Sequence, residues 1–247
     1  MDTKYIKTKS FRLAVIVRGD KNSKKLAILI PGRLDTKDYA NFISHAEYLA
    51  NQGFLALAFD PPGTWESAGK IEDYTITNYI KTVNEIIEYF GDRPTLLLGH
   101  SRGGTIAMLS CMHNLAINGI VLIMANYGSP SPPRKQTDGF IVSYRDLPPG
   151  TSITKKQKKF SLPISYWEDG RKYNPVRALD KCTKPKLLIY GNEDEFVSAE
   201  EVKNIYQKIP EPKMISEVKS EHVYRRNKNA IQDVNKVIGK FLKQYRF

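Results

Sequence analysis

A serine stands between two glycines where the sequence changes from strand-like to helix-like. Gly99-His100-Ser101-Arg102-Gly103 follows the apolar run 95–98, which predicts a strand, and precedes 105–109, which has helical character. In this context a G-x-S-x-G stretch places its serine on a tight, strained turn, where the residues two positions away must be nearly free of side chain. The positive end of the following helix favours an oxyanion beside Ser101. We therefore interpret Ser101 as a nucleophile rather than as an incidental serine in a glycine-rich turn.

A serine hydroxyl is a poor nucleophile at neutral pH and needs a nearby base, and the sequence offers four histidines. His45 lies in a predicted helix that precedes the turn. The side chain of His100 must point away from that of its neighbour Ser101, and His113 falls on the helix that follows. His222 comes after the last predicted strand, and loops that follow parallel strands lie at one edge of the sheet. We therefore predict that His222 accepts the proton of Ser101.

The base in turn needs an acidic group that holds its ring in place. Three carboxylates, those of Glu193, Asp194 and Glu195, directly follow the predicted strand 185–191. Each of them satisfies the chain order nucleophile, acid, histidine, so the chemistry of the residues does not choose among them. Asp60 also follows a predicted strand, but it precedes the serine and breaks this order.

Two backbone N–H groups are needed to stabilise the oxyanion that forms during acyl transfer. We predict that one belongs to Arg102, the residue after the nucleophile, and the other to Arg33, in the loop after the predicted strand 26–30, with Leu34 next to it. The side chains of Arg33 and Arg102 either favour an acyl group that carries a negative charge or simply face solvent.

Strands and helices alternate from residue 26 to residue 125, which predicts an α/β fold with a mostly parallel sheet and helices on both faces. A further strand precedes this region at 11–17, and residues 5–9 extend it or pair with it. After residue 173 the prediction continues as a helix at 174–180, a strand at 185–191, a helix at 198–207 with Ser198 as its N-cap, a strand at 214–218 and a helix at 228–245. We expect one domain over 1–247.

The stretch 126–173 interrupts this alternation with six prolines and little helical periodicity. So long an interruption in an α/β domain indicates an inserted lid or a functional loop region. Large aromatic side chains are the candidates to line an apolar substrate pocket, or else they pack in the lid and core: Trp65, Tyr127, Tyr144 and Trp167.

The chain has 247 residues and is 41% hydrophobic, which is enough for a sizeable core. Its formal net charge is +12, but the lysines are scattered, and the densest cluster, 155–159, has no interleaved aromatic residue and no nucleic-acid-binding motif. We expect a lysine-rich solvated surface and no nucleic-acid partner, the alternative being attraction of anionic substrates or lipid headgroups. The polar first residues show no signal peptide, no apolar stretch is long enough to span a membrane, and the two cysteines fit a reduced, cytoplasmic protein.

Taken together, these residues resemble the α/β-hydrolase superfamily over nearly the whole chain. Gly191-x-x-Asp194-x-x-Val197 is similar to the acid loop of that family, which singles out Asp194 as the acid. Asp60-x-x-Gly63-x-x-x-Ser67 resembles its D-x-x-G-x-G-x-S loop, with Trp65 in place of the second glycine. Pro31-Gly32-Arg33 resembles its His-Gly-aromatic oxyanion loop, with proline and arginine as the departures.

The stretch 67–75 is similar to the S-x-G-K-F-E-x-x-T segment of small cinnamoyl- and feruloyl-esterase-like carboxylesterases. This resemblance implies a serine ester hydrolase for small or aromatic esters, hydroxycinnamoyl esters included, whose lid shapes the acyl pocket. Such a triad needs neither a metal nor an organic cofactor. The same fold also serves thioesterases, lipases, aminopeptidases and non-catalytic ligand-binding proteins. Whether the protein is a monomer or a homodimer stays open.

Overall fold

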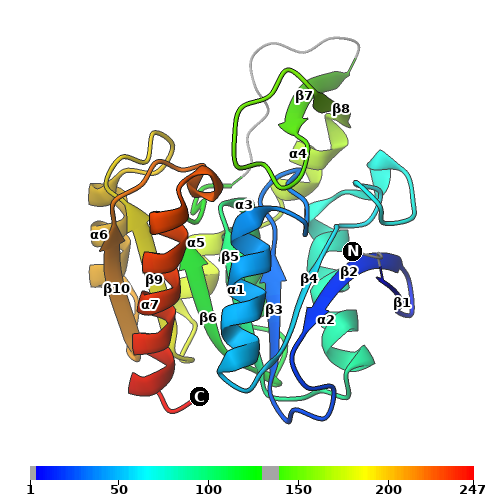
Figure 1. The fold of residues 1–247 in the computed structure, drawn as a ribbon. Coiled ribbons are helices and arrows are strands. Elements are labelled where there is room, and N and C mark those ends of the chain that lie inside the picture. The colour runs from blue at the N-terminus through cyan, green and yellow to red at the C-terminus, as the bar shows by residue number, and fades with distance from the viewer. Residues whose placement is uncertain (1–3, 130–138) are drawn as a thin grey trace.

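Buried apolar runs form the central sheet of the molecule (Figure 1). The computed structural model describes residues 4–129 and 139–247. Within them, strands are ordered β1-β2-β4-β3-β5-β6-β9-β10 in one sheet. The strands are β1 Lys4–Lys7, β2 Arg12–Arg18, β3 Leu26–Ile30, β4 Leu55–Phe59, β5 Thr95–His100, β6 Ile117–Ile123, β9 Lys186–Gly191 and β10 Lys213–Val218.

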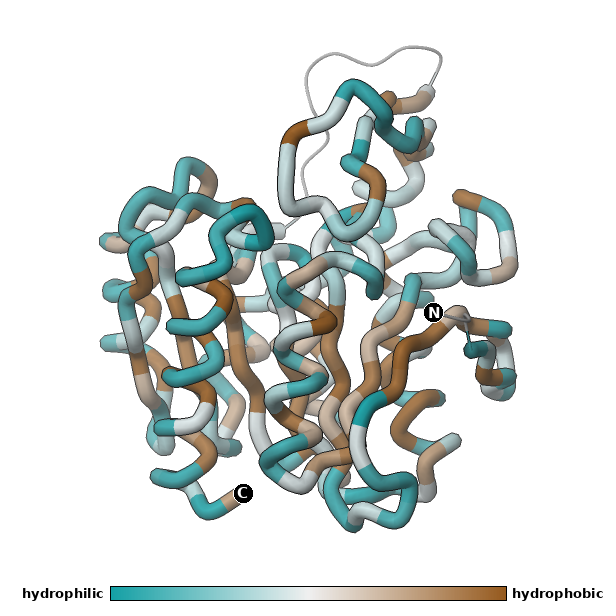
Figure 2. The backbone as a smooth tube through the Cα atoms, in the orientation of Figure 1, coloured by the Kyte–Doolittle hydropathy of each residue, from teal (hydrophilic) through white to brown (hydrophobic). Residues whose placement is uncertain are grey.

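The sheet is antiparallel at one edge and parallel over the rest of its width. β1 pairs with β2, and β2 with β4, in antiparallel fashion, whereas β4, β3, β5, β6, β9 and β10 run parallel to one another. Every residue of β3, β4 and β5 is buried, as expected for strands that are covered on both faces. Figure 2 shows that apolar residues are concentrated in these strands, while polar residues colour the outer sides of the helices.

Helices cover both faces of the sheet, as the alternation of elements predicts. α1 and α7 contribute to the core on one face, and α2, α3, α5 and α6 contribute to the core on the other. Ser198 is an N-cap as predicted, because its hydroxyl accepts a hydrogen bond from the Glu201 N–H at 3.1 Å. The helices are α1 Ala40–Asn51, α2 Ile76–Tyr89, α3 Arg102–Ser110, α4 Ser165–Gly170, α5 Pro175–Asp180, α6 Ala199–Lys208 and α7 Lys228–Gln244, with short 3-10 turns η1 Ile71–Asp73 and η2 Tyr224–Arg226.

The helix after the nucleophile turn is shorter than predicted. α3 ends at Ser110, before His113, which the sequence analysis placed on this helix. The side-chain carbonyl of Asn114 accepts the N–H of Ala116 at 3.0 Å and closes a local turn there. Such Asx turns compete with the helical backbone pattern, so the chain leaves the helix and enters β6 at Ile117.

The stretch 126–173 contains more regular structure than its composition predicts. β7, Phe140–Asp146, and β8, Gln157–Pro163, form an antiparallel hairpin, which α4 follows. Figure 1 shows this hairpin beyond the carboxyl ends of the parallel strands. Three of the six prolines in the stretch 126–173, at positions 130, 132 and 133, lie outside the described residues. In the part of the chain that the structure describes, no helix is both long and apolar enough to cross a membrane.

Candidate active site

Ser101 occupies the turn between β5 and α3 with a strained backbone. Its φ of 52° and ψ of −117° lie outside the regions that residues with a side chain normally adopt. The flanking glycines are required by close backbone approach. A Cβ at Gly99 would lie 2.2 Å from the Gly103 carbonyl oxygen, and one at Gly103 would lie 2.0 Å from the Ile30 carbonyl oxygen. The sequence pattern therefore has the steric cause that the strand–turn–helix context predicts.

The structure brings the predicted nucleophile, base and acid into one chain of hydrogen bonds. The Nε2 atom of His222 lies 2.8 Å from Oγ of Ser101. On the other side of the ring, Nδ1 lies 2.9 Å from Oδ2 of Asp194 and 3.1 Å from Oδ1. The backbone N–H groups of Phe196 and Val197 donate to Oδ1 of Asp194 at 2.8 and 3.0 Å. This geometry suits a serine whose proton passes to an imidazole held by a carboxylate.

Among the three carboxylates in the loop after β9, only the side chain of Asp194 bonds to the imidazole of His222. Glu195 accepts instead from the backbone N–H of His222, at 3.2 Å, and so helps to fix the histidine loop. Burial raises the pKa of Asp194, but the contacts with His222 and the two backbone donors outweigh it and lower the pKa below its ordinary value. The carboxylate is therefore ionised at neutral pH and holds Nδ1 protonated.

Two of the other histidines are buried and make their hydrogen bonds away from Ser101. The ring of His45 bonds to Oδ1 of Asn235 at 2.6 Å and to the hydroxyl of Tyr224 at 2.8 Å. Burial lowers the pKa of His45 to about 4, so its ring is neutral. His100 points away from Ser101 as expected, and its Nε2 donates to the backbone carbonyl of His222 at 3.0 Å. His100 thus supports the base without contacting the nucleophile.

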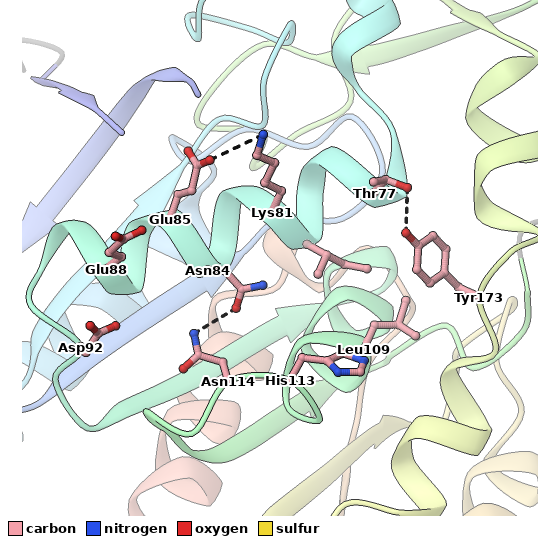
Figure 3. A pocket seen from close by; sticks show the side chains of 11 residues that line it. Thr77, Lys81, Asn84, Glu85, Glu88, Asp92, Leu109, His113, Asn114 and Tyr173 are labelled. Atoms are coloured by element: carbon pink, nitrogen blue, oxygen red, sulfur yellow. Dashed lines mark hydrogen bonds and ion pairs between the residues drawn. The ribbon is translucent and has the colours of Figure 1, made fainter. Parts of the chain in front are cut away.

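His113 lies in the turn after α3 and is exposed. It lines a surface hollow of about 650 Å³ beside α2, which Figure 3 shows together with the hydrogen bond between Asn114 and Asn84, 3.0 Å long. No residue that lines this hollow also lines the cavity at Ser101. His113 is therefore a surface residue remote from the nucleophile, and it lies just beyond the helix on which the sequence placed it.

The two predicted oxyanion donors face the same cavity as Ser101. Arg102 is the first residue of α3, and Arg33 lies in the loop after β3. Within the described chain, the N–H groups of both residues have no acceptor. The neighbouring N–H of Leu34 is already engaged, since it donates to the hydroxyl of Tyr74 at 3.1 Å. The guanidinium of Arg145 donates to the Arg33 carbonyl at 2.8 and 3.1 Å and fixes the loop.

Of the four aromatic residues predicted to contact substrate, only Tyr144 lines this cavity. Tyr127 and Trp167 are 3% and 2% exposed and belong to the core beneath, so the structure corrects their expected role to packing. Sequence cannot separate the two roles, because large aromatic side chains dominate both pockets and cores.

Trp65 supports the oxyanion loop from outside the cavity. Its indole Nε1–H donates to the Leu34 carbonyl at 2.9 Å, and its ring packs edge-on against Phe160 at 5.5 Å between centroids. Its φ is 45°, a left-handed conformation that glycine adopts without strain. The tryptophan therefore keeps the backbone shape of the glycine that it replaces in the family pattern, and its expected substrate contact is corrected to a positioning contact.

The cavity at Ser101 has a volume of about 420 Å³, within the range of small-molecule sites. Several residues that line it were missed by the sequence analysis: Asp35, Asn126, Arg145, Asp146, Gln157, Phe196, Val223, Arg225 and Arg226. The ring of Phe196, which is 70% exposed, lies 5.0 Å from that of His222. The position of Phe196, two residues after Asp194, could have indicated from the sequence that it lies at the site. Arg145 and Asp146 come from the hairpin, and nothing in the sequence around them indicates that they line the cavity.

A group of carboxylates near the oxyanion loop has the spacing of a metal site. Asp38, Asp60 and Glu66 each offer an oxygen within 4.8 Å of the others. The ammonium of Lys37 lies among them, 2.6, 3.4 and 2.5 Å from Asp38, Asp60 and Glu66 respectively. Burial lowers the pKa of Lys37, but the three carboxylates outweigh it and raise the pKa above its ordinary value. A protein cation thus already lies among these carboxylates and forms ion pairs with all three.

Comparison with known proteins decides the family. The sequence profile described as the alpha/beta hydrolase fold matches residues 28–161, more than half of the chain. The chain belongs to the alpha/beta hydrolase family. The predicted fold class and the resemblance to the α/β-hydrolase superfamily are confirmed.

The curated relatives that this chain resembles share one name, palmitoyl-protein thioesterase ABHD10. Mouse palmitoyl-protein thioesterase ABHD10, a mitochondrial protein, is 24% identical over 198 residues, and the match covers 75% of this chain and 64% of the relative. The human protein of the same name is 27% identical over 165 residues, covering 66% and 51%. The chain therefore spans less than two thirds of the length of these curated relatives.

Solved structures show the same fold. Est1E from Butyrivibrio proteoclasticus with ferulic acid bound superposes with a TM-score of 0.79 and 19% identity, covering 98% of both chains. Mouse alpha/beta hydrolase domain-containing protein 10 superposes with a TM-score of 0.76 and 18% identity, covering 99% of both chains.

Proposed function

We propose that this alpha/beta hydrolase cleaves carboxylic esters through an acyl-enzyme formed at Ser101. The observation that carries the proposal is the unbroken series of hydrogen bonds from Asp194 through His222 to Oγ of Ser101. The strained turn and the N–H groups of Arg33 and Arg102, which have no acceptor in the described chain, supply the remaining parts of an acyl-transfer site.

In the first step Oγ of Ser101 attacks the ester carbonyl while Nε2 of His222 takes its proton. The carbonyl oxygen becomes an oxyanion, which the backbone N–H groups of Arg33 and Arg102 stabilise. His222 then gives the proton to the leaving alcohol, and the acyl group stays on Ser101. A water molecule, deprotonated by His222, attacks this acyl-enzyme and releases the acid and the free serine. Asp194 stabilises the imidazolium in both steps.

The cavity favours a small or aromatic acyl group. Its volume of about 420 Å³ is at the lower end of the range for small-molecule sites. Tyr144 and Phe196 offer ring faces for an aromatic group such as a hydroxycinnamoyl group. The hairpin β7–β8 contributes Tyr144, Arg145, Asp146 and Gln157 to the lining, so we assign it the role of a lid that shapes the pocket.

A thioesterase is the second candidate, because the curated relatives are named palmitoyl-protein thioesterases. The same serine, histidine and oxyanion donors serve a thioester, whose carbonyl carbon is attacked in the same way. These relatives are also named as mitochondrial, so the cytoplasmic location stays a prediction from the two cysteines.

A panel of substrates tests both candidate functions, and also tests whether the protein is a lipase, a peptidase or a non-catalytic binding protein. 4-Nitrophenyl esters from acetyl to palmitoyl, feruloyl methyl ester, an acyl thioester and an aminoacyl anilide are offered to wild type and to Ser101→Ala. We expect the wild type to turn over esters and Ser101→Ala to lose this activity. The matched variant Ser161→Ala, changed at an exposed position of the hairpin, is expected to retain it. Saturable binding without turnover would contradict the proposal.

A further inference from the structure

The cavity at Ser101 contains more positive than negative side chains. Asp35 and Asp146 are the acidic residues that line it, against five arginines: Arg33, Arg102, Arg145, Arg225 and Arg226. A small, partly enclosed cavity with such an excess of cations attracts an anionic group.

Three of the five arginines share the two carboxylates. Asp146 accepts from Arg225 at 3.0 Å and from Arg226 at 2.7 Å. Asp35 lies 3.8 Å from Nε of Arg145 and 4.0 Å from a terminal nitrogen of Arg225. These ion pairs account for the arginines that come from the hairpin and from η2.

Arg33 and Arg102 have no carboxylate within 4.0 Å in the described chain. The side chain of Arg102 is nevertheless only 8% exposed, and its Nε has no hydrogen-bond partner there. Its terminal nitrogen lies 3.5 Å from both the Thr105 hydroxyl and the Gly128 carbonyl, which is the outer limit of hydrogen bonding. A buried guanidinium without a counterion is costly, so its retention beside the nucleophile indicates a ligand with a negative charge.

The positions of these two arginines place that charge on the acyl side of the scissile bond. Their backbone N–H groups are the proposed oxyanion donors, so their side chains begin next to the carbonyl. The guanidinium of Arg102 extends from there towards Thr105 and Gly128, and Arg33 lines the same cavity. The leaving group must instead lie beside His222, which protonates it.

We propose that the acyl group of the substrate carries a carboxylate, which Arg102 and Arg33 bind beside the oxyanion hole. The substrate class is then a half-ester or half-thioester of a dicarboxylic acid. This inference rests on the proposed function, because it needs an acyl group on Ser101. The planar guanidinium of Arg102 suits a carboxylate through paired hydrogen bonds.

The test compares two substrates of equal chain length. Mono-4-nitrophenyl adipate carries a free carboxylate, and its methyl ester is neutral. We expect kcat/KM of the wild type to be about 10- to 100-fold higher for the anionic substrate, the range of a hydrogen bond to a charged group. In Arg102→Gln and Arg33→Gln this ratio falls towards one. Both variants keep the backbone N–H, and a ratio taken within one variant cancels any general change in its activity.

Arg177→Gln is the matched control, because Arg177 is exposed on α5 and does not line the cavity. In this variant the ratio of kcat/KM for the anionic substrate to that for the neutral one is expected to stay at the wild-type value. An equal rate or a preference for the neutral ester in the wild type overturns the inference but leaves the ester hydrolase intact. A ratio that Arg102→Gln and Arg33→Gln leave unchanged also overturns it. Failure to cleave either ester overturns the proposed function itself. Binding is measured without turnover by calorimetric titration of Ser101→Ala with monomethyl adipate. We expect Ser101→Ala to bind this ligand, and the double variant with Arg102→Gln to bind it at least about tenfold more weakly. Absence of binding to Ser101→Ala overturns the inference.

Discussion

Nε2 of His222 lies 2.8 Å from Oγ of Ser101, although 121 residues separate the two positions. The parallel sheet explains this contact. β5 ends at His100 and β10 ends at Val218, so the loops that follow both strands leave the same edge of the sheet. The topology therefore determines which histidine can act as the base, and the loop after β9 brings Asp194 to its other side.

Asp194→Asn is predicted to lower kcat about 10³- to 10⁴-fold, because an asparagine does not hold the imidazole in the productive tautomer. Esterase assays at pH 7 measure this effect, with circular dichroism to show that the fold is retained.

Glu193→Gln is the matched change in the same loop, since the chain order nucleophile, acid, histidine admits both acids. It is predicted to leave kcat within about twofold of wild type, because a surface substitution away from the hydrogen-bonded site has little effect. Equal losses in the two variants would mean that the acid has been assigned wrongly.

Gly103→Ala is predicted to destabilise the fold by at least about 1–3 kcal/mol and to abolish activity. The added Cβ meets the backbone oxygens of Ile30 and Pro31 at 2.0 and 2.7 Å, and backbone cannot move aside as a side chain can. Gly128→Ala is the control, because its Cβ would meet only the side chain of Asn126 at 3.7 Å. Urea denaturation compares the two, and equal stability of both variants would contradict the steric account of the turn.

Asp35 is predicted to make the stability depend on pH in the acid range. Burial raises the pKa of Asp35, but His100, Arg225 and Arg145 outweigh it and lower the pKa to about 2 from an ordinary value of 3.8. A carboxyl whose pKa is lower in the folded state stabilises the fold above the ordinary value and loses that contribution as pH falls through about 2.

Asp35→Asn is therefore expected to lower the free energy of unfolding by about 2 kcal/mol at pH 7, with a difference that shrinks as the pH falls below 4. Urea denaturation at pH 7 and pH 3 measures it. Asp180→Asn, at an exposed position, provides the baseline. A difference that grows towards low pH would show that the sign is wrong.

The ion pairs of Asp146 are predicted to hold the β7–β8 hairpin against the body of the molecule. Asp146 ends β7 and binds Arg225 and Arg226, which lie 79 and 80 residues further along the chain. Asp146→Asn weakens both charge-assisted contacts and leaves Arg225 buried with a weaker partner. Limited proteolysis followed by mass spectrometry is expected to show several-fold faster cleavage within residues 139–163 than in wild type or in the variant Asp180→Asn, whose substitution lies at an exposed position. Unchanged cleavage would place the restraint elsewhere.

The central fold was predictable from sequence because its strands are short runs buried on both faces. Leu26–Ile30 and Leu55–Phe59 contain only apolar residues, and the elements between them have helical periodicity. The hairpin was missed because its first strand, β7, has no buried apolar face. Phe140, Val142 and Tyr144 are all substantially exposed, so no apolar run marks β7.

The arginine lining of the cavity was predictable only in part. Arg33 and Arg102 follow from their places as the predicted oxyanion donors, whereas Arg145, Arg225 and Arg226 come from the hairpin and from η2 and have no sequence pattern that points to the cavity. Asp194 shows the opposite case, where a short family pattern chose among three adjacent acids. The left-handed backbone of Trp65 was likewise invisible, because a tryptophan gives no sign of a conformation that favours glycine.

Rapid mixing with 4-nitrophenyl acetate, followed by intact-protein and peptide mass spectrometry, shows whether an acyl-enzyme forms at Ser101. We expect a burst of about one nitrophenol per protein chain and an acetyl adduct on the peptide that contains Ser101. A burst that persists in Ser101→Ala, or an adduct on another residue, would rule out Ser101 as the nucleophile.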